Sequence, residues 1–436
     1  MPAKTLQDFR NGIDQRKAEQ VVDQLGLYDC KNAFINPGFA VKKRAGMDKI
    51  SSALTADSVG LFEYNEDLYT VRHATAGSQT LSGYGVGADG PMSTSLYTLA
   101  LPDPSDAGNE VLQVWQFLIF NNNLYVVVEY DDGTIVHHYG DVADMIAGTN
   151  VAVTDTNCPN GKSVCVHDSK IFGVEPEDSN PAYVKYSATE DPTNWSKVKD
   201  ASGTLGLPAG LEASGNEFLK AVTSYRGYLC AFMQNSIQLW KTNPNPALTV
   251  LDTTVDNAFV SYFRTIAPIN EDVLYLNTTG IHSVGQKTYT DTMSTVDVGS
   301  PIAELVKASL SSSYEPKAVY FPGNNQYILA NNTDMFVFTL SSKAGLMAWT
   351  RWTVSNEILD MVAYRNYLFV RVKEGSDEHV YSFDPDSFQD ETASSTADID
   401  VEVSSSFNSL DQPGVWKQIY GSDVMFTGTA DLQHKW

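Results

Sequence analysis

The chain has 436 residues, of which 42% are hydrophobic and 11% aromatic, enough for a large buried core. Its 53 acidic residues outnumber 29 basic ones and give a net charge of −24. A protein that grips nucleic acid needs clustered basic side chains to displace the counterions of phosphate, so this charge argues against a nucleic-acid-binding surface. The 22 Tyr and 19 Phe, among short runs rich in Thr and Val, favour strands over helices.

The cysteines and the apolar runs indicate the environment of the protein. The four cysteines are scattered, and the spacing of Cys158 and Cys165 fits no common zinc or redox motif. We therefore expect buried free thiols in a protein that is assembled in a reducing cytoplasm. The most apolar stretches, such as Val114 to Phe120, are too short to span a bilayer, and the first residues lack the apolar core of a secretory signal.

Residues 1–50 differ in pattern from the rest of the chain. Four apolar residues recur there at helical spacing and predict a short amphipathic helix near Gln15–Leu25. A turn follows at Asn36-Pro37-Gly38.

Seven repeats of strand, polar turn and strand lie between residues 58 and 385. Each turn is rich in Asn, Asp or Gly, and the apolar residues that anchor the second strands are 40 to 58 residues apart. This spacing is typical of one four-stranded propeller blade per repeat. The sequence therefore predicts an all-β fold, a β-propeller of six or seven blades over residues 51–385. The anchors are Leu68, Leu124, Ile171, Leu229, Leu274, Ile328 and Leu368.

Two repeats have additional features. Between the first two anchors, Gly83 to Gly90 and Pro102 to Ser105 predict long loops in one blade. In the second repeat, Asp131-Asp132-Gly133-Thr134 predicts a tight hairpin, because Asp-Gly supplies the positive φ angles that such turns require. His137 and His138 follow on the return strand, where neighbours point to opposite faces, so we expect no metal site there.

One further helix is predicted near the end of the repeats. Ser300 is a good N-cap, Pro301 fits the first helical position, and an apolar stripe runs from Ile302 to Leu310. A single amphipathic helix among strands must dock on a blade edge or on a neighbouring subunit. Beyond it, residues 384–398 read as an acidic linker before a last strand-like block.

The sequence contains no nucleophile elbow, phosphate loop, dinucleotide-binding motif or His-Glu-x-x-His motif. We expect no catalytic residues, no cofactor and no enzymatic activity. An alternative is a glycan-binding or glycan-cleaving propeller, either receptor-binding or sialidase-like, which would expose aromatic side chains and an arginine cluster at one end of the ring. Ser187 to Trp195 loosely resembles a sialidase hairpin repeat, although a Pro-containing turn anchored by a buried Trp explains it equally well. A cellular repeat scaffold is disfavoured, because Trp-Asp and kelch signatures are absent.

The order of local signatures resembles the tail nozzle proteins of short-tailed bacteriophages, also described as tail tubular or DNA-stabilisation proteins. The similarity extends over nearly the whole chain, and its most specific stretch is Tyr225 to Leu229 followed by Asn235 to Trp240. The other segments that carry it are Phe9 to Asp14, Asn32 to Gly38, Lys43 to Gly46, Ser187 to Trp195, Gly280 to Ser283, Val298 to Ile302 and Trp416 to Gly421.

This resemblance implies a homohexameric ring below the portal in the virion tail, assembled in the bacterial host cytoplasm. Its partners would be portal-adaptor ring proteins, tail fibre or spike proteins, and double-stranded DNA that passes without sequence-specific binding. We expect no stable membrane insertion. DNA carries one charge per roughly 1.7 Å of its axis, so an acidic lumen would repel it and keep it from binding as it passes. We hypothesise that many acidic residues face that lumen.

We expect assembly contacts from the segments outside the repeats. Residues 1–50 would form an N-terminal docking segment and residues 386–436 a C-terminal one, together making a β-rich platform beside the propeller. No metal or cofactor residues are assigned. The candidate assembly residues are Phe9, Arg10, Asn32, Asn36, Pro37, Arg44, Trp416 and Lys417.

Overall fold

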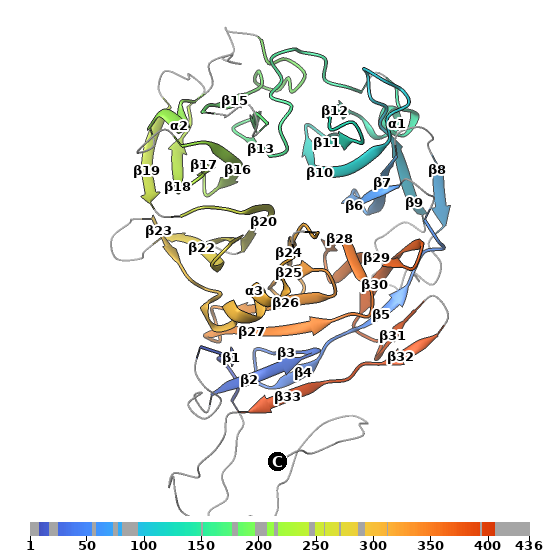
Figure 1. Ribbon diagram of the computed structural model, residues 1–436, viewed down its shortest axis with the longest axis vertical. Helices are drawn as coiled ribbons and strands as arrows, with labels where there is room; N and C mark the ends of the chain where they lie inside the picture. The colour runs from blue at the N-terminus through green and yellow to red at the C-terminus, as the bar shows by residue number, and fades with distance from the viewer. Residues whose placement is uncertain are drawn as a thin grey trace, which may run out of the picture.

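The computed structural model describes residues 8–16, 25–54, 58–72, 77–80, 95–149, 151–176, 182–196, 207–212, 217–243, 249–256, 258–269, 272–286, 293–311, 313–392 and 395–405. Seven sheets of these residues stand around a common centre, so the fold is a β-propeller, as predicted (Figure 1). The first strand of each sheet contacts the first strand of the next, and the seventh sheet returns to the first.

The first four sheets, or blades, follow in chain order. Blade one has β6 (Val59–Tyr64), β7 (Asp67–Arg72), β9 (Ser95–Ala100) and β8 (Gly77–Thr80). Blade two has β10 (Val111–Phe120), β11 (Asn123–Tyr130) and β12 (Ile135–Gly140). Blade three has β13 (Val164–His167), β14 (Lys170–Val174) and β15 (Val184–Tyr186). Blade four has β16 (Leu219–Tyr225), β17 (Tyr228–Met233), β18 (Ser236–Lys241) and β19 (Val250–Asp256).

The last three blades complete the ring. Blade five has β20 (Tyr262–Ile269), β21 (Asp272–Asn277), β22 (Gly280–Gln286) and β23 (Met293–Val296). Blade six has β24 (Lys317–Phe321), β25 (Gln326–Asn331), β26 (Asp334–Ser341) and β27 (Leu346–Thr353). Blade seven has β28 (Glu357–Tyr364), β29 (Tyr367–Glu374), β30 (Asp377–Asp384) and β5 (Gly46–Lys49).

Every predicted anchor lies on the second strand of its blade. The turn before the anchor is built as the repeat predicts. Asn65 and Glu66 in blade one, and Asn121 and Asn122 in blade two, all have positive φ values. Two successive left-handed residues make a turn whose twist matches that of the two strands it joins. The polar turns therefore set the first hairpin of these blades from local sequence alone.

The fourth strand of blade seven comes from the start of the chain. β5 pairs antiparallel with β30, with Met47 opposite Phe383. This differs from the prediction that all of residues 1–50 belong to a docking segment. The physical reason is that β30 would otherwise leave an open sheet edge, which a strand from the other end of the repeats can cover.

Blade one departs from a simple meander. β9 lies between β7 and β8, parallel to β7, with Leu68 opposite Leu96. A parallel pair needs a longer connection than a hairpin, and the long segment between the first two anchors supplies it. Of the two predicted loops, Gly83 to Gly90 lies outside the described residues. In the other, the Asp103 carboxylate accepts hydrogen bonds from the Ser105 backbone and hydroxyl.

The predicted helix near residue 300 is confirmed. A 3₁₀ turn, η5 (Ser300–Ile302), leads into α3 (Ala303–Ser309), and no side chain caps either start. Ser300 is thus not the N-cap that was predicted. The helix docks against β22 of its own chain, where Ile302 and Val306 are buried. The helix predicted near Gln15–Leu25 lies largely outside the described residues. The other described helices, α1 (Val142–Ala147) and α2 (Ala209–Glu212), are short, and no described helix has the length and apolarity to cross a membrane.

The cysteines are buried as the sequence predicts, and two neighbouring histidines are buried as well. All four cysteines are buried free thiols. His137 and His138 are both buried and face different partners: the Tyr125 hydroxyl is 2.7 Å from Nδ1 of His137, and the Tyr130 hydroxyl is 2.9 Å from Nε2 of His138. Burial lowers the pKa of these imidazoles to about 4 and about 3, so both rings are neutral structural groups at pH 7.

Candidate docking surface

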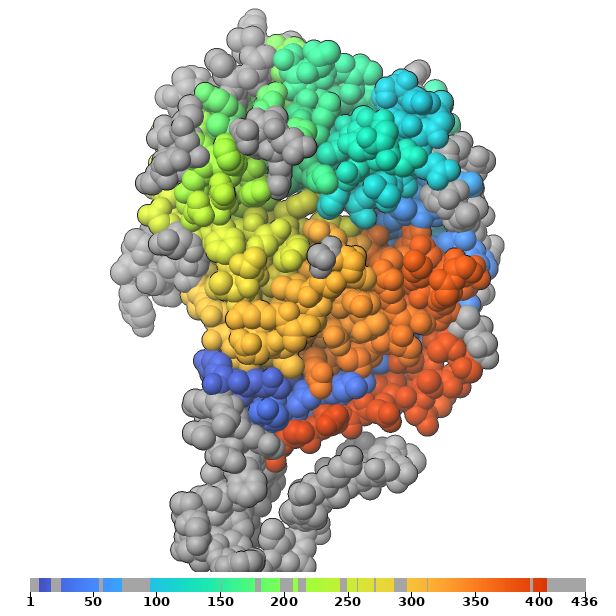
Figure 2. Space-filling model, viewed as in Figure 1, coloured from blue at the N-terminus to red at the C-terminus, as the bar shows by residue number. Residues whose placement is uncertain are grey.

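Both ends of the described chain meet on the outside of blade six, in a group of strands that we call the terminal layer. The seven-stranded sheet runs β24-β25-β26-β27-β1-β2-β33, so three terminal strands extend the blade outward. In Figures 1 and 2 the blue N-terminal and red C-terminal segments lie side by side along this rim. The layer consists of β1 (Gly12–Ile13), β2 (Gly26–Lys31), β3 (Ala33–Ile35), β4 (Val41–Lys43), β31 (Gln389–Glu391), β32 (Thr396–Asp398) and β33 (Glu402–Ser405).

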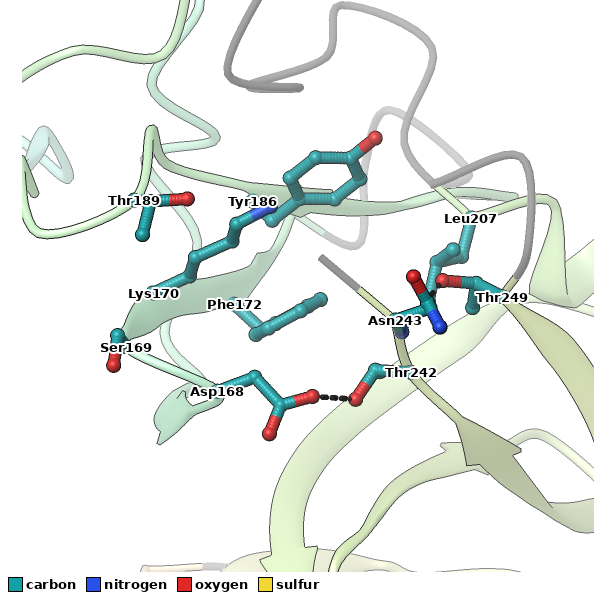
Figure 3. A pocket seen from close by; sticks show the side chains of 10 residues that line it. All are labelled: Asp168, Ser169, Lys170, Phe172, Tyr186, Thr189, Leu207, Thr242, Asn243 and Thr249. Atoms are coloured by element: carbon teal, nitrogen blue, oxygen red, sulfur yellow. Dashed lines mark hydrogen bonds between the residues drawn. The ribbon is translucent and has the colours of Figure 1, made fainter. Parts of the chain in front are cut away.

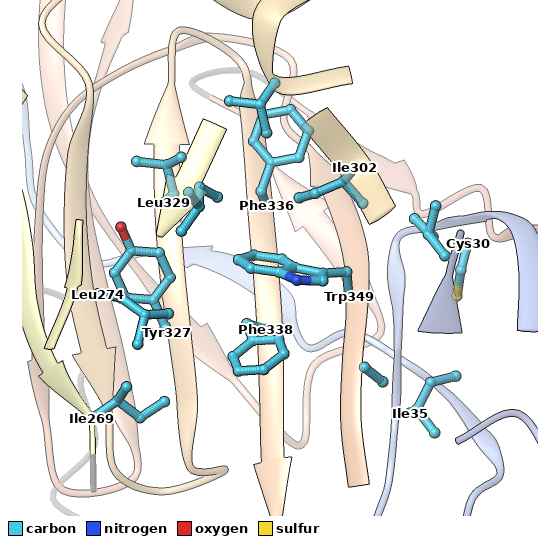
Figure 4. Close-up of a cluster of buried hydrophobic side chains, with 14 of the residues drawn as sticks. Cys30, Ile35, Ile269, Leu274, Ile302, Tyr327, Leu329, Phe336, Phe338 and Trp349 are labelled. Atoms are coloured by element: carbon cyan, nitrogen blue, oxygen red, sulfur yellow. The ribbon is translucent and has the colours of Figure 1, made fainter. Parts of the chain in front are cut away.

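The terminal layer shares its hydrophobic core with the propeller. One continuous cluster joins Cys30 and Ile35 of the layer to Trp349 and Phe338 of blade six and to Ile302 beside α3 (Figure 4). Because these side chains are buried together, the layer is an integral part of the fold rather than an independent domain.

Gly12 explains how β1 reaches the edge of blade six. It lies opposite Trp349 with a φ of 59°, a conformation that favours glycine. A Cβ atom there would be 2.6 Å from the carbonyl oxygen of Trp349. Only a residue without a side chain allows the two backbones to approach this closely.

Asn32 and Arg44 connect the layer from within. The Asn32 amide oxygen accepts hydrogen bonds from the Thr353 backbone at 2.8 Å and from Arg44 Nε at 3.2 Å. Its amide nitrogen donates to the carbonyl of Asp400 at 2.9 Å. Arg44 also forms a two-bond ion pair with Asp390. These two side chains are buried and join the N-terminal segment, blade six and the C-terminal segment.

A second ion pair binds β2 to blade six. The Arg351 Nε atom donates to Asp29 at 2.9 Å, and Nη2 donates to the other carboxylate oxygen. Burial on its own would lower the pKa of Arg351, but the bond to Asp29 and that residue's charge raise it overall. Beside this pair, the Trp352 indole donates to the carbonyl of Ala33 at 3.0 Å.

Arg10, Asn36 and Pro37 lie nearer the surface. The Arg10 guanidinium pairs with Asp8 and stands 4.3 Å from the centroid of the Phe39 ring. Asn36 forms a turn by accepting from two backbone amides, and Pro37 beside it is exposed.

The eight predicted assembly residues fall into four groups. Arg10 and Pro37 are available to a partner, and Phe9 and Asn36 are half-buried. Asn32 and Arg44 are buried and stabilise the layer instead of facing a partner, which differs from the predicted role. Trp416 and Lys417 lie outside the described residues.

Several residues of the site were missed at the level of sequence. Asp29, Arg351, Trp352 and Asp390 complete the connections inside the terminal layer. The sequence marks Asp390 only as part of an acidic linker. No local pattern marks it, because its partner lies at the opposite end of the chain.

The outer edge of the terminal layer exposes apolar and acidic side chains together. Val401 and Val403 are 41% and 44% exposed, and Phe388, which precedes β31, is 68% exposed. Asp398 and Glu402 are exposed beside them. Within the part of the chain that the structure describes, β33 pairs with β2 alone, so its other edge is open. Open strand edges bearing apolar side chains are suited to contact with another chain.

The centre of the propeller is occupied by side chains. Trp115 is on β10 of blade two and Phe263 is on β20 of blade five, yet their ring centroids are 5.5 Å apart. Since these first strands belong to blades that are not neighbours, the contact crosses the axis. The Lys162 ammonium stands 4.0 Å from the Trp115 ring centroid and 3.1 Å from Glu129.

An ion network beside these aromatic rings joins three consecutive blades. Asp360 on β28 accepts a hydrogen bond from Arg264 on β20 at 2.7 Å and from Lys317 on β24 at 3.0 Å. Burial would raise the pKa of Asp360, but the charges of Lys317 and Arg264 lower it overall. The same burial lowers the pKa of Lys317 to about 8. One carboxylate thus stabilises two cations near the axis.

No protein-family model matches the chain, and no curated protein matches it. Among solved structures, the chain is similar to the WD40 domain of Pan2 from Neurospora crassa, with 11% identity and a TM-score of 0.41, covering 78% of this chain and 95% of that one. It is also similar to Hsv2 from Kluyveromyces lactis, with 13% identity and a TM-score of 0.35, covering 63% of this chain and 75% of that one. The sheet topology described above is what defines the propeller.

Proposed function

We propose that the protein is a structural subunit of a short phage tail, forming a hexameric nozzle ring that retains the packaged genome and conducts DNA during ejection. The observation that carries the proposal is the terminal layer. The segments that hold the nozzle-like motifs at the start of the chain fold against the C-terminal segment, and β33 leaves an open edge among the described strands. A preformed layer of this kind suits docking, because little conformational entropy is lost when a partner binds.

The filled propeller axis supports a role as a wall of the ring. Trp115 and Phe263 meet across the centre, so aromatic side chains cross the propeller axis where a central channel would run. In the proposed ring, DNA passes along a lumen between subunits. The net charge of −24 would repel the phosphates at that lumen and limit binding. Portal-adaptor proteins would meet the terminal layer, and fibre or spike proteins would meet the propeller rim.

Single substitutions on the open edge test this proposal. A deletion of residues 1–30 would not serve, because it would remove Leu27 and Cys30 from the shared core. A loss of assembly could then result from misfolding instead of from a lost docking contact. Val403→Asp places a charge on the exposed edge without touching the core. We expect the variant to fold normally and to fail to assemble with the adaptor ring, as measured by native mass spectrometry and by complementation of a phage that lacks the gene.

The matched control is Val296→Asp, which changes a similarly exposed valine on the outer strand of blade five. It should assemble like the wild type. If Val403→Asp also enters six-membered rings and yields infectious particles, the terminal layer is not the docking surface.

The alternative is a glycan-binding or glycan-cleaving propeller, and the positions of three buried or half-buried arginines do not support it. Arg264 pairs with Asp360, Arg351 with Asp29, and Arg371 with Glu378, each inside this chain. A sialidase-like cluster would need such groups free for a substrate carboxylate. One cavity, between blades three and four, is suited to binding a sugar without cleaving it.

A further inference from the structure

A cavity of about 160 Å³ opens between blades three and four, away from the terminal layer (Figure 3). A water molecule takes about 30 Å³ of liquid, so the cavity holds roughly five waters. Sites for drug-sized ligands are typically at least about 300 Å³. The space therefore suits a single small ring or a short polar chain end.

One wall of the cavity is apolar and aromatic. Phe172 and Leu207 are almost completely buried at its base. The Tyr186 ring lies tilted against Phe172, with 5.5 Å between the centroids. The Lys170 ammonium is 5.0 Å from the Tyr186 centroid and so occupies the position over the ring that a ligand cation would need.

The opposite wall presents a carboxylate held by a directional hydrogen-bond chain. Ser224 Oγ is 2.8 Å from His167 Nδ1, and His167 Nε2 is 2.7 Å from Thr242 Oγ1. The Thr242 hydroxyl in turn donates to Asp168 Oδ2, as the dashed line in Figure 3 shows. Burial lowers the pKa of His167, so its ring is neutral and carries one proton. With that proton on Nε2, every donor in the chain has an acceptor.

The hydrogen-bond chain leaves one carboxylate oxygen of Asp168 for a ligand. Asp168 Oδ2 is occupied by Thr242, whereas Oδ1 has no hydrogen-bond partner among the described residues. The hydroxyls of Ser169 and Thr189 border the same cavity. Because the relay crosses from blade three to blade four, Asp168 is held in place before any ligand arrives.

The chemistry of the walls selects among ligand classes. The Asp168 carboxylate would repel an anion, and the Lys170 ammonium would repel a cation. A fully apolar group would offer no hydrogen-bond donor to the Asp168 carboxylate, which is the main polar group of this wall. A neutral ring with several hydroxyls satisfies both walls, since its hydroxyls donate to Asp168 and its C–H face packs on Phe172 and Leu207.

We propose that this cavity binds one pyranose unit of a glycan, with the Asp168 carboxylate accepting hydrogen bonds from its hydroxyls. The binding is independent of the proposed tail role. The site binds sugar without cleaving it. Cleavage usually needs two carboxyl groups, and Asp168 is the only one among the described residues that line the cavity. The Thr242 hydroxyl holds Asp168 in a fixed orientation.

Saturation-transfer NMR on the full chain tests the proposal, using glucose, galactose, mannose and N-acetylglucosamine at millimolar concentration. A second arm uses oligosaccharides that end in the same sugars and so distinguishes a free sugar from a chain end. We expect at least one sugar to bind the wild type and Asp168→Ala to weaken its binding at least tenfold. Thr242→Val keeps the charge but removes the orienting hydrogen bond, so it should weaken binding several-fold.

The control is Asp252→Ala, which removes an exposed carboxylate on β19 of blade four and should bind like the wild type. Thermal unfolding verifies that each variant is folded. If Asp168→Ala does not fold, the binding measured for Thr242→Val decides the outcome. Absence of binding for every sugar in both arms would overturn the proposal. So would equal binding by the wild type and the folded cavity variants. Normal ring assembly by a protein that binds no sugar would overturn this inference alone.

Discussion

Arg44 and Asp390 form an ion pair with 2.8 Å between Nη1 and Oδ1, although 346 residues separate them along the chain. Their side chains are only 1% and 11% exposed. The same Asp390 oxygen accepts a hydrogen bond from the backbone of Met47 on β5 at 3.1 Å. This single carboxylate therefore connects the C-terminal segment both to Arg44, which follows β4, and to the strand that completes blade seven.

Removing one member of this pair should strongly destabilise the fold. Arg44→Ala leaves the Asp390 carboxylate buried without its counter-charge, so we expect a loss of about 3–5 kcal/mol in the free energy of unfolding. Urea denaturation followed by tryptophan fluorescence measures this change. The control is Arg365→Ala, which removes an exposed ion pair with Glu66 and should cost less than about 1 kcal/mol.

A double variant separates the pair from its surroundings. Arg44→Met combined with Asp390→Leu removes both charges and keeps most of the buried volume. It should be more stable than Arg44→Ala, because no isolated charge remains buried. Equal losses in the Arg44→Ala and Arg365→Ala variants would contradict the importance assigned to this pair.

The close approach of β1 to blade six should make Gly12 intolerant of any side chain. Gly12→Ala forces a Cβ atom to within 2.6 Å of the Trp349 carbonyl oxygen, so β1 must separate from β27. Gly345 is the matched control, since it has a φ of 65° and no described atom within 4 Å of the position that an alanine Cβ would take. Both substitutions cost about 1–2 kcal/mol for the left-handed backbone. Any further loss in Gly12→Ala, seen in thermal unfolding or in faster hydrogen exchange of β1 and β2, measures the steric contact.

The propeller was predictable because its signal is local. Four of the turns place two left-handed residues between apolar strands, and every anchor lies on a second strand. These turns are Asn65-Glu66, Asn121-Asn122, Asp168-Ser169 and Arg226-Gly227. The placement of β5 and the parallel insertion of β9 were not predictable in this way. Both depend on which distant strand covers an open edge, and residues such as Met47 and Leu96 look locally like any other strand residue.

The candidate site was predictable only in outline. The motif residues Asn32 and Arg44 were found, but their burial and their partners Thr353, Asp390 and Asp400 were not. A sequence shows that an Arg is present and cannot show whether it faces solvent or a carboxylate far along the chain. The cavity at Asp168 was missed for the same reason, because its walls come from two blades.

Acid should destabilise the protein through its buried histidines. Burial lowers the pKa of His137 to about 4, whereas an unfolded chain has a histidine pKa near about 6.5. Between these values the unfolded chain binds a proton that the folded chain does not, so stability falls as the pH is lowered through that window. The contribution is on the order of 3 kcal/mol.

The test of this pH dependence compares unfolding free energies from pH 7 down to pH 4.5. His137→Gln removes the titrating group and should show a shallower fall than the wild type. His282→Gln changes a half-buried imidazole whose pKa is also lowered by burial, and its effect should be smaller. Identical pH profiles for His137→Gln and the wild type would show that this ring does not control acid stability.

The ion network at the propeller axis should respond differently to the loss of each member. Asp360→Asn removes the carboxylate that hydrogen-bonds to both Arg264 and Lys317, so we expect a loss of about 3–5 kcal/mol at pH 7. Lys317→Met leaves a one-to-one pair between Arg264 and Asp360, so its loss should be smaller.

The pH dependence of the lysine variant gives an independent measurement. The pKa of Lys317 is lowered by burial to about 8, against 10.5 for an ordinary lysine. Between these values the unfolded chain binds the proton and the folded chain does not, so this residue makes stability rise with pH from 8 to 10.5. The unfolding free energy of the wild type, relative to that of Lys317→Met, should therefore grow across that range. A difference that stays constant would mean that Lys317 titrates like a solvated lysine, so that burial does not lower its pKa in the folded chain.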